Sequence, residues 1–483
     1  MRSKWQNVGM ALTERPVSTP AYTPTDEVPG IVAAVKAAYA TGRTRTLGWR
    51  EAQLDGLDRM LDLEAERLLN ALAADVGKPS LEAYATDIGI VRGEIKDLRK
   101  NTAKWMKPRK ASLALNSRPG KGYLVAEPYG VSLIIGPWNY PVQLIIEPLA
   151  AAIAAGNAAI IKPSEVAPAT SAALAELIPR YLDSEAIAVV QGDAPVATAL
   201  LAERYDHVFF TGSTAVGRIV YEAAAKNLTP VTLELGGKSP VIVDDSVNVD
   251  VAAHRIAWGK WLNAGQTCIA PDYVLVSEAK RDELVSAIGA AFEEFAAGTT
   301  PADNADYGSI VNSRHTERIG RMLDEHGGTV AVGGHYDPAT RYVDPTVIVD
   351  PDLNSPLMQE EIFGPVLPVI TAASVEAAIE FVNEREKPLA LYVFSENDEV
   401  TDHVIANTSA GGTVINHVLL HCGPGELPFG GVGESGIGRY HGESGFEEFS
   451  NMRAVLKKPT RPDVKLLYPP YTAKKEKLIR RFL

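Results

Sequence analysis

The chain has 483 residues, of which 46% are hydrophobic and 22% are charged, a balance typical of a globular protein with about three structural units. Its formal net charge of −13 argues against nucleic acid as its main partner. Cys268 and Cys422 are its only cysteines, which excludes a disulfide framework and predicts a reducing, cytoplasmic location.

The N-terminal part of the chain predicts helices followed by an extended arm. Residues 29–100 are rich in Ala, Leu, Glu and Arg, and their apolar positions recur at three- and four-residue steps. From residue 103 to residue 130 the sequence becomes basic and is interrupted by Pro108 and by Pro119-Gly120. This change favours a hairpin or an arm over a core element.

A regular alternation of strands and helices begins after the arm. We predict strands at residues 131–135, 158–162, 186–191 and 207–211, with helices at residues 142–155 and 170–181 between them. Apolar strands joined by helices indicate a parallel sheet covered on both faces.

A second alternation begins at residues 239–243 and runs to about residue 415. Helices are predicted near residues 251–262, 279–295 and 375–383. The fold class is therefore α/β, with two lobes. After Phe449 we predict an exposed strand at residues 452–458 and a short basic amphipathic end at residues 474–483, for which a solvated or inter-subunit role is favoured over a membrane surface.

No membrane-spanning segment is expected. Between residues 131 and 161 the only charged residue is Glu147, but repeated Gly and Pro residues leave no uninterrupted helix of the roughly 20 residues that a bilayer requires. Residues 1–13 contain no continuous apolar run, so we expect no signal peptide.

Cys268 stands in the most informative segment, Asn263-Ala264-Gly265-Gln266-Thr267-Cys268-Ile269-Ala270-Pro271. Free cysteines are usually small buried apolar residues. The flanking Gly265-Gln266-Thr267 is unsuited to a close-packed core position and instead favours a turn in which a substrate can reach the thiol. Because the thiolate is the reactive form, a helix terminus or a base would be needed nearby.

Asn139 and Glu234 complete a set of groups with complementary chemistry. Asn139, in Pro137-Trp138-Asn139-Tyr140-Pro141, is either a helix cap or an amide that stabilises an oxyanion. Glu234 follows an apolar run, where a carboxylate is costly unless it is paired or working, and burial would raise its pKa toward that of a useful base. A nucleophile, an oxyanion donor and a base are the minimum for acyl-thioenzyme chemistry.

Two strand ends predict a nucleotide site. The segment Gly212-Ser213-Thr214-Ala215-Val216-Gly217 follows a strand and opens a helix, whose free amides can bind phosphate. The segment Lys162-Pro163-Ser164-Glu165 ends another strand, where a carboxylate can accept ribose hydroxyls, although a simple turn is the alternative.

Two further patterns are interpreted as decoys. Residues 431–436 match the dinucleotide fingerprint, but they follow no clean strand and precede no long helix, so they predict a loop. His417 and His421 are four residues apart without a third ligand at a recognisable spacing, so no metal site is expected.

Taken in order, these motifs resemble the aldehyde dehydrogenase superfamily over nearly the whole chain. The blocks that carry the resemblance are Pro137-Trp138-Asn139, Lys162-Pro163-Ser164-Glu165, Phe210-Thr211-Gly212-Ser213, Glu234-Leu235-Gly236-Gly237-Lys238, Gly265-Gln266-Thr267-Cys268, Glu360-Glu361-Ile362-Phe363-Gly364-Pro365 and Pro428-Phe429-Gly430-Gly431-Val432-Gly433. The short N-terminal region, Cys268-Ile269-Ala270-Pro271-Asp272-Tyr273 and Tyr468-Pro469-Pro470-Tyr471 resemble the class 3 branch, which includes fatty and aromatic aldehyde dehydrogenases.

The resemblance implies three parts. Residues 1–103 and 130–235 would form a Rossmann-like NAD-binding domain, and residues 236–444 an α/β catalytic domain. Residues 104–129 and 445–483 would form a small β oligomerisation arm and tail. Members of this branch are commonly homodimers. Some carry a C-terminal membrane anchor, which we do not expect here.

The resemblance also implies a reaction. Cys268 would attack an aldehyde, with Asn139 and the Cys268 backbone N–H holding the oxyanion. Hydride transfer to NAD(P) would leave a thioester, and Glu234 would activate the water that releases the carboxylic acid. An apolar, aromatic aldehyde tunnel predicts medium-chain or longer aliphatic, or aromatic, substrates. Its walls would be Tyr140, Trp258, Thr267, Cys422, Phe429 and His441.

The cofactor would be NAD, with NADP as the alternative, because Glu165 should repel a 2′-phosphate. Lys162 and Glu165 would hold the adenosine ribose, Gly212 and Ser213 the pyrophosphate, and Glu361 with Phe363 the nicotinamide ribose. The whole implied cofactor set is Pro137, Trp138, Lys162, Ser164, Glu165, Gly212, Ser213, Gly217, Leu235, Gly236, Glu361 and Phe363.

Three alternatives stay open at this point. A CoA-acylating aldehyde dehydrogenase would not need the base Glu234. A cofactor-independent thiol esterase would turn over without nicotinamide. A binding protein that kept the fold but lost activity would be expected to lack one of Cys268, Glu234 and Asn139.

Overall fold

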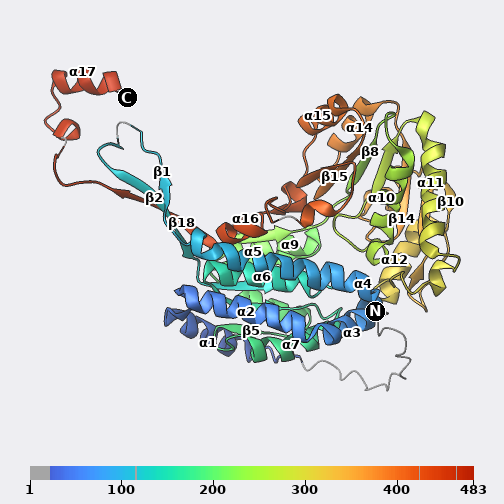
Figure 1. Cartoon of the computed structure of the whole chain (residues 1–483), viewed down its shortest axis with the longest axis horizontal. Helices are drawn as coiled ribbons and strands as arrows, with labels where there is room; N and C mark the ends of the chain where they lie inside the picture. The colour runs from blue at the N-terminus through green and yellow to red at the C-terminus, as the bar shows by residue number, and fades with distance from the viewer. Residues whose placement is uncertain (1–21, 115–116, 424, 464, 483) are drawn as a thin grey trace, which may run out of the picture.

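The computed structural model describes residues 22–114, 117–423, 425–463 and 465–482. Within these ranges the chain forms a six-stranded sheet, a seven-stranded sheet, a three-stranded sheet and a small two-stranded hairpin. Figure 1 shows the blue-to-green helices and the six-stranded sheet in one lobe, the yellow-to-orange seven-stranded sheet in a second, and the three-stranded sheet in an arm that projects away from both.

The N-terminal region is helical, as its periodicity predicts. Its elements are α1 (Val28–Ala40), α2 (Leu47–Leu63), α3 (Ala65–Val76), α4 (Ser80–Ala83), the π-helical turn η2 (Tyr84–Gly89) and α5 (Ile90–Trp105). Apolar residues of α2 and α5, among them Leu57 and Ile95, are fully buried in the same cluster as α6. α2 and α5 therefore pack with α6 on one face of the first sheet.

The first sheet has the strand order β17-β7-β6-β3-β4-β5. Its strands are β3 (Val131–Ile135), β4 (Ala158–Lys162), β5 (Ile187–Val189), β6 (His207–Thr211), β7 (Val231–Glu234) and β17 (Gly436–Ile437). The connecting helices are α6 (Gln143–Ala155), α7 (Pro168–Tyr181), α8 (Ala194–Ala202) and α9 (Thr214–Ala225). All pairs are parallel except β17 with β7.

Alternation along β3 separates the two faces of this sheet. Leu133 and Ile135 belong to the cluster that includes α1 and α8, whereas Ile134 belongs to the cluster that includes α6. From β3 the chain moves outward to β4 and β5, then returns to place β6 on the other side of β3. The carboxyl ends of β3 and β6 therefore flank a topological switch point, where open α/β sheets bind ligands.

The second sheet has the order β10-β13-β14-β9-β8-β15-β16 and is parallel except for β10. Its strands are β8 (Pro240–Val243), β9 (Tyr273–Val276), β10 (Thr329–Val332), β13 (Thr346–Val349), β14 (Val366–Thr371), β15 (Ala390–Phe394) and β16 (Gly412–Ile415). Its helices are α10 (Val249–Trp261), α11 (Glu278–Ala296), α12 (Ser313–Asp324), α13 (Pro356–Gln359), α14 (Val375–Asn383) and α15 (Asp398–Asn407), and the hairpin is β11 (Tyr336–Asp337) with β12 (Tyr342–Val343).

The arm joins segments from both halves of the sequence. β2 (Lys121–Pro128) pairs antiparallel with β1 (Arg109–Ala111) on one side and with β18 (Ser450–Lys457) on the other. α16 (Gly442–Glu448) leads into β18, and α17 (Ala473–Phe482) ends the described chain at the tip of the arm (Figure 1). The predicted hairpin and exposed C-terminal strand are thus confirmed.

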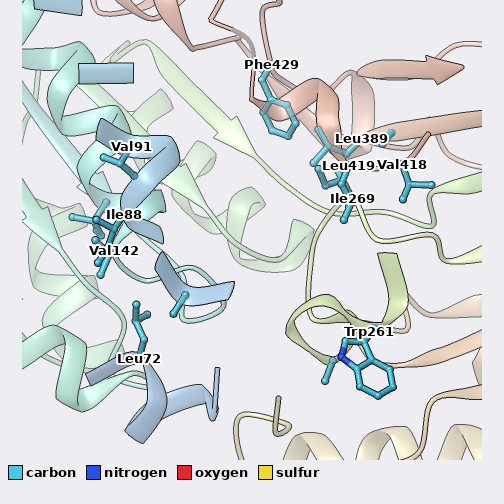
Figure 2. Packing of buried hydrophobic residues seen from close by; sticks show 14 of the residues in the cluster. Leu72, Ile88, Val91, Val142, Trp261, Ile269, Leu389, Val418, Leu419 and Phe429 are labelled. Atoms are coloured by element: carbon cyan, nitrogen blue, oxygen red, sulfur yellow. The ribbon is translucent and has the colours of Figure 1, made fainter. Parts of the chain in front are cut away.

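One hydrophobic cluster reaches both lobes. Figure 2 shows Ile88 and Val142 on the N-terminal side, and Trp261, Ile269 and Phe429 on the side of the second sheet. Among the described residues, no helix has the length and apolar character that a membrane crossing requires. The domain boundaries at residues 103, 130, 235 and 444 stay predictions.

Candidate active site

A cavity of about 270 Å³ contains the thiol of Cys268 at its wall. All of the residues predicted to line the aldehyde tunnel line this cavity: Tyr140, Trp258, Thr267, Cys422, Phe429 and His441. The π-helical turn η2 contributes Ala85 and Thr86, and α5 contributes Ile90. π-helical turns are rare and frequently occur at functional sites.

The loop that carries Cys268 is more tightly built than the sequence suggests. Asn263, Ala264 and Gly265 have φ of 51°, 49° and 70°, so the chain turns sharply between α10 and Cys268. A Cβ at residue 265 would lie 2.2 Å from the oxygen of Gly364, so this position requires glycine for both its φ and its contact. Cys268 itself is half-buried, as expected of a thiol that a substrate can reach.

The buried side chain of Gln266 stabilises this loop by hydrogen bonds to backbone groups. The residue is fully buried, and its amide nitrogen donates to the carbonyls of Asn263 at 2.9 Å and Ser309 at 3.0 Å. Its amide oxygen accepts the backbone N–H of Val311 at 2.9 Å. The expectation that Gly265, Gln266 and Thr267 are unsuited to the core is therefore wrong, because all three are buried. The three hydrogen bonds of Gln266 satisfy its buried amide.

Asn139 faces the Cys268 loop. Its side-chain amide donates to the carbonyl of Gln266 at 3.1 Å, and the residue is buried. The alternative in which Asn139 caps the next helix is wrong, since the first amides of α6 donate to Asp87 instead. Gln266 is two residues before Cys268, so this bond holds the Asn139 amide near the thiol. An amide donor in that position is suited to stabilise an oxyanion.

Glu234 ends β7 and is buried without hydrogen-bond partners for its carboxyl oxygens among the described residues. Burial raises its pKa well above the usual value, and the carboxyl of Glu448 adds to that rise. As predicted, an apolar environment moves this carboxyl toward the range of a general base.

Charge is disfavoured around the thiol as well. Burial raises the pKa of the Cys268 thiol well above its usual value, and the carboxyls of Glu361 and Glu234 raise it further. Burial also raises the pKa of Glu361 to about 8, and Asp272 contributes to this shift. Burial therefore disfavours the charged forms of the thiol and of both carboxyls, and the thiol must lose its proton before it can act as a nucleophile.

The cavity wall is mainly apolar but has one polar side. The hydroxyl of Tyr140 and that of Thr267 are 2.6 Å apart, which joins the wall to the residue before the thiol. His441 lies 3.4 Å from Glu147, and although burial disfavours its charged form, this carboxylate raises the His441 pKa above the usual value. Burial raises the pKa of Cys422 to about 12, so the second thiol stays protonated at neutral pH.

The predicted cofactor residues gather at the carboxyl edge of the first sheet. Pro137 and Trp138 follow β3, and the Trp138 ring packs on Phe363 with centroids 5.4 Å apart. Lys162 is the last residue of β4 and Ser164 follows the strand, and the ammonium of Lys162 lies 2.9 Å from the carboxylate of Glu165. This ion pair offers both a donor and an acceptor to ribose hydroxyls.

The opening turn of α9 provides a second part of this edge. Ser213 caps the helix, its hydroxyl accepting the N–H of Val216, so the amino end of α9 follows directly from Gly212. A Cβ at Gly217 would lie 2.6 Å from the side chain of Leu235, so glycine lets the helix approach the strand closely. The helix amino end is suited to phosphate, as predicted.

Glu361 lies against Gly236, just after β7. A Cβ on Gly236 would lie 2.3 Å from its carboxylate, and one of its buried oxygens has no hydrogen-bond partner among the described residues. A buried carboxylate oxygen without a partner can accept a hydrogen bond from a ribose hydroxyl, and Gly236 leaves room beside it. These residues as a set therefore fit a dinucleotide.

Several cationic side chains hold backbone carbonyls of the site. Lys238 donates to the carbonyls of Leu357 and Glu360, each at 2.8 Å, and Arg318 donates to that of Glu361 at 3.0 Å. Lys78 lies beneath Asn139. Lys238 belongs to the block Glu234-Leu235-Gly236-Gly237-Lys238, whereas no local motif marks Arg318 or Lys78. The burial that distinguishes Lys78 is a property of the fold.

The glycine-rich decoy behaves as predicted. Residues 433–435 form a short 3₁₀ turn followed by β17, with no long helix. In the part of the chain that the structure describes, no three His, Cys, Asp or Glu side chains gather as a metal site would require.

Comparisons with known proteins agree with this arrangement. Residues 3–455 match the aldehyde dehydrogenase family. Aldehyde dehydrogenase family 3 member A2 of mouse is 47% identical over 93% of each chain. A dimeric, NADP-preferring aldehyde dehydrogenase of dog is 46% identical over 92% of this chain and 98% of its own. The substrate-bound structure of Staphylococcus aureus AldH superposes with a TM-score of 0.91 at 44% identity, over 94% of this chain and 99% of its own. The predicted fold class and family resemblance are confirmed.

Alkylation of Cys268 by iodoacetamide should report the raised thiol pKa. We expect a rate that still rises at about pH 9, because the thiolate is the reactive form. At that pH, Glu361→Gln should accelerate alkylation, since it removes a carboxylate that opposes thiolate formation. Mass spectrometry of the peptide that contains Cys268 distinguishes it from Cys422.

Glu360→Gln is the matched control, because Glu360 is a half-exposed neighbour that pairs with Arg321. Its alkylation rate should equal that of the unaltered protein. A rate that levels off below about pH 8, or no response to Glu361→Gln, would contradict the electrostatic account.

Proposed function

Because this chain belongs to the aldehyde dehydrogenase family, and is thus an NAD(P)-dependent oxidoreductase that converts aldehydes to carboxylic acids, we propose that Cys268, Asn139 and Glu234 perform this chemistry. The observation that carries the proposal is the side-chain bond from Asn139 to the Cys268 loop beside a buried, unpartnered Glu234. The roles follow from the chemistry of each group.

Cys268 is the nucleophile. Its thiolate attacks the aldehyde carbon, and the carbonyl oxygen becomes an oxyanion of a thiohemiacetal. The Asn139 amide and the Cys268 backbone N–H stabilise that oxygen by donating hydrogen bonds. Because both donors belong to rigid, buried segments, they need little reorganisation when the charge develops.

When NAD(P) is bound, it supplies the hydride acceptor that allows the thiohemiacetal to become a thioester. Lys162 and Glu165 would hold the adenosine ribose, the α9 turn the pyrophosphate, and Glu361 the nicotinamide ribose. Trp138 and Phe363 form an aromatic wall that excludes water on this side.

Glu234 is the base for hydrolysis. Its raised pKa makes it a stronger base than an exposed carboxylate, so it can take a proton from the water that attacks the thioester. This role favours water over CoA as the acyl acceptor. Since both the thiol and Glu234 work in their deprotonated forms and both have raised pKa values, activity rises with pH through neutrality.

The cavity supports medium-chain or longer aliphatic, or aromatic, aldehydes as substrates. Leu144, Trp258, Ile269, Leu419 and Phe429 are among its apolar walls. Burying an alkyl chain or ring against them contributes roughly 25 cal/mol for each Å² removed from water. A short charged semialdehyde would lose its hydration there without a matching counter-charge.

We further propose a cytoplasmic homodimer. β16 and β18 each have a strand partner on one side only among the described residues, and such free edges readily pair with another chain. One similar enzyme is named dimeric. Two free cysteines are consistent with a reducing compartment.

The reaction is tested by NAD(P)H formation across an aldehyde panel. Cys268→Ala should lower kcat by on the order of 10⁴-fold or more, because the nucleophile is lost. Glu234→Gln should leave a burst of about one NAD(P)H per site and slow later turnover by roughly 10²- to 10⁴-fold. Asn139→Ala should slow both phases by roughly 10²- to 10³-fold.

Three results would contradict these roles. Full activity of Cys268→Ala would remove the thioester route. Acyl-CoA formation on adding CoA would favour a CoA-acylating enzyme, and ester turnover without any aldehyde oxidation would favour an esterase. A preference for short charged semialdehydes would contradict the proposed substrates.

Cofactor preference is tested by kcat/KM with NAD and NADP. We expect NAD to be favoured, because Glu165 carries a negative charge at the ribose site. Glu165→Gln should shift the ratio toward NADP by about tenfold, since Lys162 is then left without its carboxylate partner. Glu185→Gln, an exposed carboxylate that pairs with Arg43, is the control. Equal efficiency of the unaltered protein with both cofactors would overturn the preference.

The oligomeric state is tested by light scattering of the full chain. The proposal expects twice the mass of one chain at micromolar concentration. An Ala454→Pro substitution in β18 should weaken association, because proline disturbs a strand and removes a backbone donor. A monomer mass for the unaltered protein would refute the dimer, and a tetramer mass would revise it.

A further inference from the structure

Lys78 and Asp87 form an ion pair in the interior, directly beneath the segment that carries Asn139. The ammonium of Lys78 lies 2.7 Å from a carboxylate oxygen of Asp87, and neither side chain is exposed to solvent. Lys78 comes after α3, which ends at Val76 and is followed by Gly77 with φ of 62°, and Asp87 lies in the π-helical turn η2. Two local backbone irregularities therefore direct these side chains inward.

Lys78 makes two contacts with the Asn139 segment. Its ammonium donates to the backbone carbonyl of Asn139 at 3.1 Å. It also lies 3.8 Å from the centre of the Tyr140 ring, in cation–π geometry. One cation thus contacts both the proposed oxyanion donor and the next residue, whose hydroxyl is 2.6 Å from that of Thr267.

Asp87 fixes the same segment from its other end. Its second carboxylate oxygen accepts the backbone N–H groups of Val142 and Gln143, each at 3.3 Å. These are the first amides of α6, which have no acceptor within their own helix. The pair therefore holds the chain on both sides of Pro141.

The carbonyl of Asn139 does not need Lys78 to satisfy its hydrogen-bonding capacity. The side-chain amide of Asn263 already donates to it at 3.0 Å, and also donates to the carbonyl of Gln266 at 3.1 Å. The Lys78 ammonium is a second, charged donor to this carbonyl. Two donors together restrict the plane of the peptide bond between Asn139 and Tyr140. That restriction sets the direction in which the Asn139 side chain leaves the backbone.

A buried ion pair is a poor device for stability alone. Removing two charges from water is costly, and apolar residues of similar volume often give equal or greater stability. A pair retained under the active site is more readily explained by what its donors orient.

We propose that Lys78, held by Asp87, is a positioning residue for the oxyanion site: it fixes the Asn139 backbone and the Tyr140 ring so that the Asn139 amide stays directed at the Cys268 loop. This inference rests on the proposed role of Asn139. It adds a positioning partner from the N-terminal helical region, which also lines the cavity with Ala85, Thr86 and Ile90.

The test compares two reactions of the same thiol. Aldehyde oxidation passes through an oxyanion, whereas alkylation of Cys268 by iodoacetamide does not. Lys78→Met should lower kcat by about 10- to 100-fold, because small misplacements of a catalytic group have effects of this size. The KM for the nicotinamide cofactor and the alkylation rate of Cys268 should each stay within about twofold.

The double variant identifies the residue through which Lys78 acts. If Lys78 acts through Asn139, adding Lys78→Met to Asn139→Ala should cause little further loss of kcat, so the two effects are not additive. A multiplicative loss would overturn the proposal, as would unchanged kcat in a folded Lys78→Met protein or a parallel fall in alkylation.

Two further variants keep the test independent of folding. Lys78→Met/Asp87→Asn removes both charges, so a folded protein with reduced kcat supports positioning, and one with full kcat refutes it. Arg50→Met is the matched control. Arg50 is a buried cation that donates to the carbonyl of Ala154 at 2.8 Å, near the opposite end of α6. It should lose thermal stability without loss of kcat.

The failure of this inference and that of the proposed function give different results. If Asn139→Ala itself retains full kcat, the proposed oxyanion role is wrong. If Asn139→Ala is impaired while both Lys78 variants are fully active, only the role of Lys78 is wrong.

Discussion

The short connection between the two sheets determines how the active site is assembled. β7 ends at Glu234 and β8 begins at Pro240, so residues 235–239 alone join them. Even a fully extended chain of this length spans only roughly 20 Å. The carboxyl edge of the first sheet must therefore lie close to the amino edge of the second. Glu234 ends β7 and Asn139 follows β3 in the first sheet, and Cys268 precedes β9 of the second, so all three meet at this junction.

The same junction excludes water, and this exclusion explains the electrostatics of the site. Burial raises the pKa of Cys268, Glu234 and Glu361 together, so none of them is easily charged in the resting protein. Such a site strengthens every hydrogen bond to an oxyanion that forms inside it. It also makes each wrongly placed polar atom costly, which explains why Gln266 has all of its amide atoms satisfied.

The sequence predicts those features that depend on local patterns. β3, β4 and β6 have the predicted limits, because each is a short apolar run between breakers. The gathering of Lys162, Ser164, Gly212 and Ser213 at one edge of the first sheet was also predictable, since residues at the ends of parallel strands meet at one edge. By contrast, β17 pairs with β7 across about 200 residues of sequence, and no local pattern encodes that register.

The residues that the sequence does not reveal are those that act across long separations. Lys78 is 61 residues from Asn139, and it looks like an ordinary surface lysine until the fold buries it. Gly265 looks like a flexible turn residue, although its contact with Gly364 leaves no room for a side chain. In both cases the decisive quantity is a distance in space, which periodicity and composition do not contain.

Side chains that bind main-chain carbonyls recur around this site. Lys78 donates to Asn139, Lys238 donates to Leu357 and Glu360, and Arg318 donates to Glu361. Because the bonds from Lys78 and Arg318 are to the backbone, they leave the side chains of Asn139 and Glu361 unoccupied by these cations. A loop built this way can have a fixed path and still present an unpartnered carboxylate or amide, which packing of apolar side chains alone could not provide.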